Sequence, residues 1–148
     1  MSPIISRLSG PLGFAFYAGA SGPPPPSGLG AAYGGGFYIG ILGGAYWVVA
    51  DNDTQVNGSF NNRDTAVNNA QAEAACGDWF IPSYTEMQWT KGQKNYWDSY
   101  TQDPYWSATQ KPGDNHGVGA VNLAPNSGNN WCWCNNPAKI RAFRKVVY

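Results

Sequence analysis

The sequence contains few charged side chains, and neither sign dominates. Charged residues make up 12% of the 148 residues, about half of the ~25% usual in soluble proteins, and nine basic residues balance nine acidic ones. Proteins that bind phosphates need clustered Lys and Arg, so the composition predicts neither a nucleic acid nor an anionic membrane surface as a partner. A net charge of zero leaves little repulsion between copies, and we expect a homo-oligomer.

Long apolar runs are also absent from the sequence. No run approaches the ~20 residues of a membrane-spanning helix, so we expect no membrane insertion. The N-terminal region contains Arg7 and lacks the continuous apolar segment of a secretory signal peptide. We therefore expect that this region does not act as a signal peptide.

Histidine and cysteine are too scarce to predict a metal or a cofactor. The single histidine, His116, lies in a polar segment with no nucleophile beside it, which is typical of a solvated loop. With one His and no CxxC pair, a four-ligand zinc site lacks ligands. The three cysteines, Cys76, Cys132 and Cys134, cannot all pair within one chain. We favour free thiols, and a bond from Cys76 to either of the other two stays open.

Aromatic residues, glycine and proline are abundant instead. Aromatic residues make up 15% of the chain, and there are 19 glycines and 11 prolines. This composition favours a loop-rich β or α+β domain that is packed largely by aromatic side chains. It argues against a helical bundle, and against a disordered chain, because the aromatic residues can bury a large apolar area.

Residues 1–32 differ from the rest and are predicted to be an arm and a spacer. Prolines and glycines break any long helix or central strand there, and the run Pro23–Pro26 favours an extended polyproline II spacer. The apolar segment Leu12–Ala18 is either part of a disordered tail or an arm that docks on a neighbouring subunit. Exposed aromatic side chains are a liability on a free tail, so we favour the arm. Its predicted docking residues are Leu12, Phe14, Phe16 and Tyr17.

Local signals predict a hairpin and two helices in the next part of the chain. Gly43-Gly44 separates two apolar runs and accepts positive φ at both positions, which indicates a two-residue hairpin. The polar residues 51–62 are predicted to form a surface loop. Alanines at helical spacing predict a helix over residues 62–76 that lies close on a sheet. Ser83, with Glu86 three residues later, predicts a capping box and a second helix that ends near Gly92.

Three segments of the C-terminal half resemble, in this order, the motifs of a known family. They are Asp78-Trp79-Phe80-Ile81-Pro82-Ser83-Tyr84-Thr85-Glu86-Met87, Tyr105-Trp106-Ser107-Ala108-Thr109 and the predicted terminal strand Ile140-Arg141-Ala142-Phe143-Arg144-Lys145-Val146. The family is the C-type-lectin-like domains related to the formylglycine-generating enzymes (the sulfatase-modifying factor superfamily), in the form common in phage virion proteins. The glycine-rich segment Tyr33–Gly40 is similar to the opening of the phage members, so the resemblance covers about residues 33–148.

The resemblance implies an α+β fold of the C-type-lectin-like kind, with a small, twisted, mostly antiparallel sheet, two helices and long loops. It implies a non-enzymatic phage virion protein, part of a tail, neck or fibre appendage, whose head adheres to the host surface or binds another virion protein. The partners expected from this are other virion proteins, bound through the N-terminal arm, and a host-surface glycan or protein. The alternative is a capsid or tail decoration (cement) protein with no host-binding role.

The family also contains enzymes and calcium-binding lectins, and neither pattern is complete here. The related oxidase-type enzymes use a thiol pair and copper, whereas Cys132 and Cys134 form a C-x-C without the residues that surround the pair in those enzymes. Calcium-dependent lectins carry Glu-Pro-Asn and Trp-Asn-Asp ligand motifs, which do not occur in this chain. Asp51-Asn52-Asp53 is similar to the start of an EF-hand loop, but the glycine and closing Glu are missing. We therefore expect no enzymatic activity and no metal.

A recognition surface is predicted in the loops before the terminal strand, which form the exposed, variable face in the family. Strand alternation puts Trp131 and Trp133 on one face and both nearby cysteines on the other. The tryptophans either belong to the core or provide an exposed ring that stacks on sugar or protein, with asparagine amides as donors and acceptors. The candidate binding residues are Asn115, His116, Asn129, Asn130, Trp131, Trp133 and Asn135.

Overall fold

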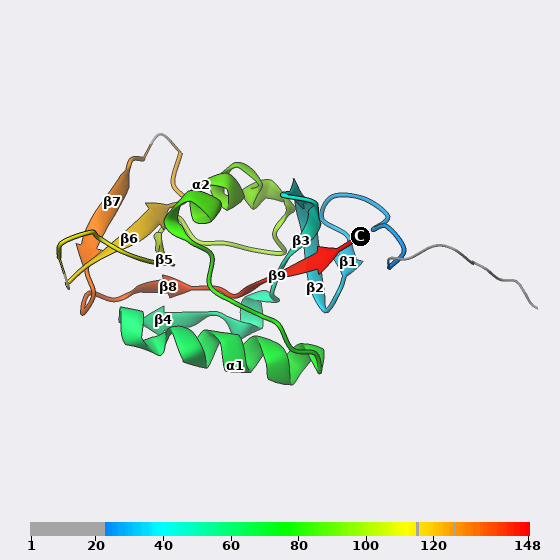
Figure 1. The fold of residues 1–148 in the computed structure, drawn as a ribbon, viewed down its shortest axis with the longest axis horizontal. Helices are drawn as coiled ribbons and strands as arrows, with labels where there is room; N and C mark the ends of the chain where they lie inside the picture. The colour runs from blue at the N-terminus through cyan, green and yellow to red at the C-terminus, as the bar shows by residue number, and fades with distance from the viewer. Residues whose placement is uncertain (1–22, 115, 126) are drawn as a thin grey trace, which may run out of the picture.

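The computed structural model describes residues 23–114, 116–125 and 127–148. These residues form an α+β domain with two α-helices and two β-sheets, so the α+β part of the predicted fold is confirmed (Figure 1). The helices and strands are β1 (Ala32–Tyr33), β2 (Gly36–Leu42), β3 (Ala45–Val49), β4 (Val56–Gly58), α1 (Arg63–Ala74), α2 (Tyr84–Gly92), β5 (Pro104–Gln110), β6 (Gly117–Asn122), β7 (Asn129–Trp133), β8 (Ala138–Ile140) and β9 (Phe143–Val147).

The strands divide into two sheets where the sequence predicted one. Their orders are β1-β2-β3-β9 and β4-β8-β5-β6-β7, and all neighbours are antiparallel except β5 and β8. Figure 1 shows the two sheets at opposite ends of the domain, with α1 along β4 and α2 on the other side of β8 and β9. Within the described residues, no helix is both long enough and apolar enough to span a membrane.

The predicted hairpin and helices are confirmed. Gly43 and Gly44 have φ values of 61° and 76°, and they join β2 to β3 in a left-handed turn that other residues rarely adopt. In α1, Ala66 and Ala70 are buried, as the alanine spacing predicts. The helix ends at Ala75, whose φ of 53° is left-handed.

The capping box of α2 is present as predicted. The hydroxyl of Ser83 accepts a hydrogen bond from the backbone N–H of Glu86, and the Glu86 carboxylate accepts one from the N–H of Ser83. Replacing Ser83 with alanine is expected to lower the free energy of unfolding by about 1 kcal/mol, because one N–H of the first turn loses its partner. Urea denaturation measures this change, and an unchanged midpoint would contradict it.

The predicted surface loop at residues 51–62 is wrong. This segment forms two 3₁₀ turns, η2 (Asn52–Thr54) and η3 (Phe60–Asn62), with β4 between them. Thr54 and Phe60 are buried, and the ring of Phe60 packs edge-on against Trp106. The polar, asparagine-rich composition of the segment hides these two inward-facing side chains.

The predicted single terminal strand over residues 140–146 is also wrong. β8 ends at Ile140 and belongs to one sheet, whereas β9 begins at Phe143 and belongs to the other. The chain leaves the strand conformation at Arg141, whose side chain turns into the interior and donates to the carbonyls of Ala50 and Ser99. The break thus carries the chain from one sheet to the next.

The three segments singled out in the sequence contact one another through backbone hydrogen bonds. Phe80 and Phe143 exchange two bonds of 2.8 Å, and the N–H of Ala108 donates to the carbonyl of Pro82 at 2.7 Å. The core lies around these contacts in two clusters, one containing Trp79 and Trp106 and the other containing Trp47. Trp79 and Trp106 are buried.

Candidate functional site

The strand β7 presents two tryptophan rings to solvent. Trp131 is 42% exposed and Trp133 is 65% exposed, so of the two alternatives that the sequence left open, the exposed position is the one observed. In the part of the chain that the structure describes, β7 is the last strand of its sheet and has β6 as its single neighbour. Figure 1 shows it at one end of the domain. We call the exposed side chains of Trp131, Trp133 and the neighbouring His116 the β7 face.

The opposite face of β7 carries the cysteines, as the alternation predicts. Cys132 and Cys134 are half-buried and pack against the cluster that contains Val118 and Phe60. Because one side of the strand is anchored in the core, the other side must point outward. Cys132, Cys134 and the half-buried Cys76 are free thiols.

Tyr84 supports the ring of Trp131, with the two ring centroids 4.9 Å apart. Tyr84 is the first residue of α2, so the capping box at Ser83 holds its backbone in place. Burial raises the pKa of Tyr84, and the nearby Cys132 adds to this shift. The sequence analysis missed Tyr84 as part of this surface, because only the packing of α2 on β5 and β6 brings its ring to Trp131.

A tight turn before β6 positions His116. The carboxylate of Asp114 accepts a hydrogen bond from the backbone N–H of His116, and the N–H of Lys111 donates to the carbonyl of Gly117. This backbone hydrogen bond from His116 is the main reason that the pKa of Asp114 lies below its usual value. The imidazole centroid of His116 is 5.8 Å from that of Trp133. The predicted residues His116 and Trp133 are therefore neighbours.

The other predicted binding residues lie in β7, in the turn after it, or outside the described residues. Asn129 and Asn130 lie in β7, where they pair with Val121 and Ala120 of β6. Asn135 is exposed in the turn after β7. Asn115 and the predicted docking residues of the arm lie outside the described residues; these docking residues are Leu12, Phe14, Phe16 and Tyr17.

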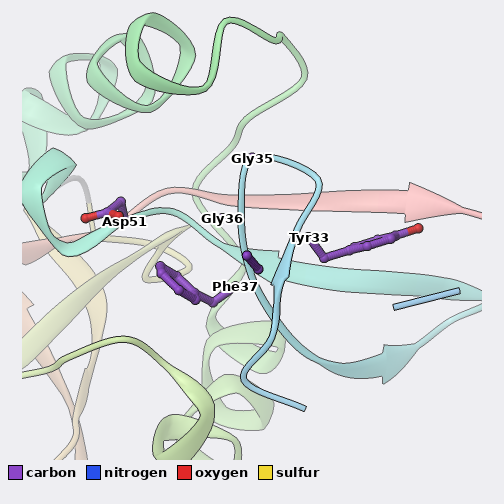
Figure 2. A pocket seen from close by; sticks show the side chains of 6 residues that line it. Tyr33, Gly35, Gly36, Phe37 and Asp51 are labelled. Carbon is purple, nitrogen blue, oxygen red and sulfur yellow. The ribbon is translucent and has the colours of Figure 1, made fainter. Parts of the chain in front are cut away.

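A separate open hollow lies beside β1 and β2, far from β7 along the domain. Its lining residues are Ala32, Tyr33, Gly35, Gly36, Phe37 and Asp51. Figure 2 shows the Tyr33 side chain extending away from Asp51, so the polar groups do not converge. The carboxylate of Asp51 instead accepts a hydrogen bond from the N–H of Asp53. Among the described residues, no three His, Cys, Asp or Glu side chains are grouped to hold a metal.

The Cys132 thiol is expected to react slowly with alkylating agents. Burial raises its pKa, so less thiolate is present near neutral pH, whereas reactive cysteines have a lowered pKa. We expect alkylation of Cys132 by iodoacetamide to reach its half-maximal rate at a higher pH in the native protein than in the unfolded chain. Peptide mass spectrometry after labelling measures this. Superimposable pH profiles would contradict it.

Comparison with known proteins adds no relative. No protein-family model matches this chain, and no curated protein matches it. The function is therefore argued from the β7 face and from the motif segments described above.

Proposed function

We propose that the protein is a non-enzymatic structural protein of a phage virion, part of a tail, neck or fibre appendage. Its domain is a C-type-lectin-like head that binds either the host surface or another virion protein. Support comes from the three motif segments, which resemble those of phage members and which contact one another through Phe80, Phe143, Pro82 and Ala108. The α+β architecture with two helices among the described residues is compatible with such a head.

The observation that carries the binding role is the position of the β7 face. Trp131 and Trp133 expose their rings at one end of the domain, while the described chain begins at residue 23 at the other end (Figure 1). A head attached through residues 1–22 would therefore point Trp131 and Trp133 away from its attachment. An exposed aromatic pair is typical of surfaces that bind sugar rings or apolar side chains.

The experiment that tests this function asks where the protein is and what it binds. Gold-labelled antibody against the protein should mark the tail, neck or fibres of intact phage particles in electron micrographs. The purified protein should bind host cells or a second virion protein, and the former predicts that it blocks phage adsorption. Particles without any label would contradict a virion role. A label on the capsid, with no host binding and particles that fall apart when the protein is missing, would favour the decoration alternative.

Replacing Trp133 with alanine is expected to weaken partner binding by about tenfold or more, because central aromatic residues dominate many interfaces. The free energy of unfolding should change by less than about 1 kcal/mol, since 65% of the side chain is already exposed. Binding to cells or to purified virion proteins, together with urea denaturation, separates the two effects.

Ile41→Ala is the matched control for this variant. Ile41 is 51% exposed and lies in β2, in the other sheet. Its truncation removes exposed apolar surface without touching β7, so it should leave binding unchanged. Equal loss of binding in both variants would contradict a specific role of the β7 face.

A further inference from the structure

The outer edge of β7 offers backbone hydrogen-bonding groups as well as tryptophan rings. In an antiparallel pair, residues alternate between those bonded to the neighbouring strand and those that point away from it. The N–H of Cys134 donates to the carbonyl of His116, and the register pairs Cys132 with Val118. Residues 130, 132 and 134 therefore bond toward β6.

Trp131 and Trp133 consequently point their backbone groups toward the open edge. The carbonyl of Trp133 accepts the N–H of Asn136 in the following turn. This leaves the N–H and C=O of Trp131 and the N–H of Trp133 facing outward, in the part of the chain that the structure describes. An edge of this kind is a template for an added strand. A glycan would use the rings but not this backbone pattern, so the edge favours an extended polypeptide.

A segment that suits this edge lies in the chain itself, outside the described residues. In an extended conformation, Leu12, Phe14 and Phe16 share one face, and Gly13, Ala15 and Tyr17 lie on the other. Large side chains at every second residue repeat at about 6.8 Å, the spacing at which Trp131 and Trp133 follow each other in β7. Residues 8–50 and residues 129–133 contain no charged side chain, so no charge has to be buried or opposed when the arm contacts β7.

The segment cannot reach β7 of its own chain. The described chain begins at residue 23 at the end of the domain opposite β7 (Figure 1). The five residues from 18 to 23 span at most about 18 Å when fully extended. A domain of this size is about 35 Å across, given a radius of gyration of about 13 Å. The β7 edge of a second copy has no such limit.

We infer that residues 12–18 of one copy add as an antiparallel strand to the outer edge of β7 of the next copy. This inference rests on the proposed virion assembly role and names the partner of the β7 face. Leu12, Phe14 and Phe16 lie on the face of Trp131 and Trp133, and their backbone N–H groups point toward β7. The arm and the edge are different surfaces, so the contact is head-to-tail and repeats into a ring or a filament.

Sedimentation velocity of the full chain tests the head-to-tail contact. We expect association that grows with protein concentration and changes little with salt, because the contact is uncharged. Two variants test the contact: an arm variant, Phe14→Ser with Phe16→Ser, and an edge variant, Trp133→Pro. Each should have an association constant at least about tenfold lower than that of the natural protein. Proline at position 133 removes an N–H that points away from β6, which edge strands tolerate. Ala15→Ser is the control on the other face of the arm and should associate normally.

Mixing the two defective variants gives the sharpest outcome. The arm variant keeps an intact β7 edge and the edge variant keeps an intact arm, so an equal mixture should form a complex that stops at two copies. A mixture that stays monomeric while the natural protein associates would overturn the inference, and so would a natural protein that is monomeric at every concentration.

Synthetic peptides give a second test that does not depend on the folding of the edge variant. A labelled peptide of residues 10–20 should bind the full-length arm variant. Methylation of the Phe14 backbone nitrogen should abolish this binding, whereas methylation of the Ala15 nitrogen should preserve it. Equal binding of both methylated peptides, or the reversed pattern, would overturn antiparallel addition to β7.

The outcomes separate this inference from the proposed function. Unlabelled phage particles would contradict the virion role even if the purified chain associates head-to-tail. A monomeric chain that is present on particles and binds host cells through Trp133 would overturn the strand addition and leave the virion role standing.

Discussion

Replacing Arg141 with alanine is expected to lower the free energy of unfolding by about 3–5 kcal/mol, a large part of the stability of an ordinary domain. The Arg141 side chain is fully buried and pairs with Asp98 at 3.0 Å. It also donates to the side chains of Asn52 and Gln55 and to the carbonyls of Ala50 and Ser99. Truncation leaves these acceptors without their shared donor, and the lost bond to the carbonyl of Ala50 is fully buried.

The matched control is Arg144→Ala, only three residues further along the chain. Arg144 pairs with Asp78, which is 61% exposed, and water can replace most of that interaction. The variant also loses the bond from Arg144 Nη1 to the carbonyl of Gly34, so we expect a total loss of about 1–2 kcal/mol, smaller than that of Arg141→Ala. Denaturation in urea, with circular dichroism as the readout, measures both variants. Equal losses would contradict the structural role assigned to Arg141.

Elements with a strong local signal were predictable from the sequence. Gly43 and Gly44 mark a turn that few other residue pairs allow, and Ser83 with Glu86 marks a helix start through contacts only three residues apart. The two faces of β7 were also predictable, because strand alternation depends only on neighbouring residues. The identity of the exposed face was left open, since tryptophan is equally suited to a core.

Features that depend on distant residues were not predictable. The break at Arg141 requires acceptors from residues 50–55 and 98–99, and nothing in the local sequence shows that these segments meet there. Residues 140–146 contain no proline or glycine to mark a break, so the local sequence is consistent with one continuous terminal strand. Tyr84 joins the β7 face for a similar reason, through packing of α2 rather than through sequence proximity.

Replacing Trp106 or Trp79 with alanine is expected to lower the free energy of unfolding by about 3–5 kcal/mol, because each leaves a large cavity in the same cluster.

Replacement with phenylalanine should distinguish the role of the Trp106 indole N–H from that of Trp79. Nε1 of Trp106 donates to the carbonyl of Gly58 at 3.0 Å, whereas Nε1 of Trp79 has no hydrogen-bond partner among the described residues. Trp106→Phe should therefore cost about 1–2 kcal/mol more than Trp79→Phe, since it leaves the Gly58 carbonyl unpaired. Urea denaturation of the four variants measures this difference. A loss below about 1 kcal/mol on truncation to alanine would show that the ring is not part of the core.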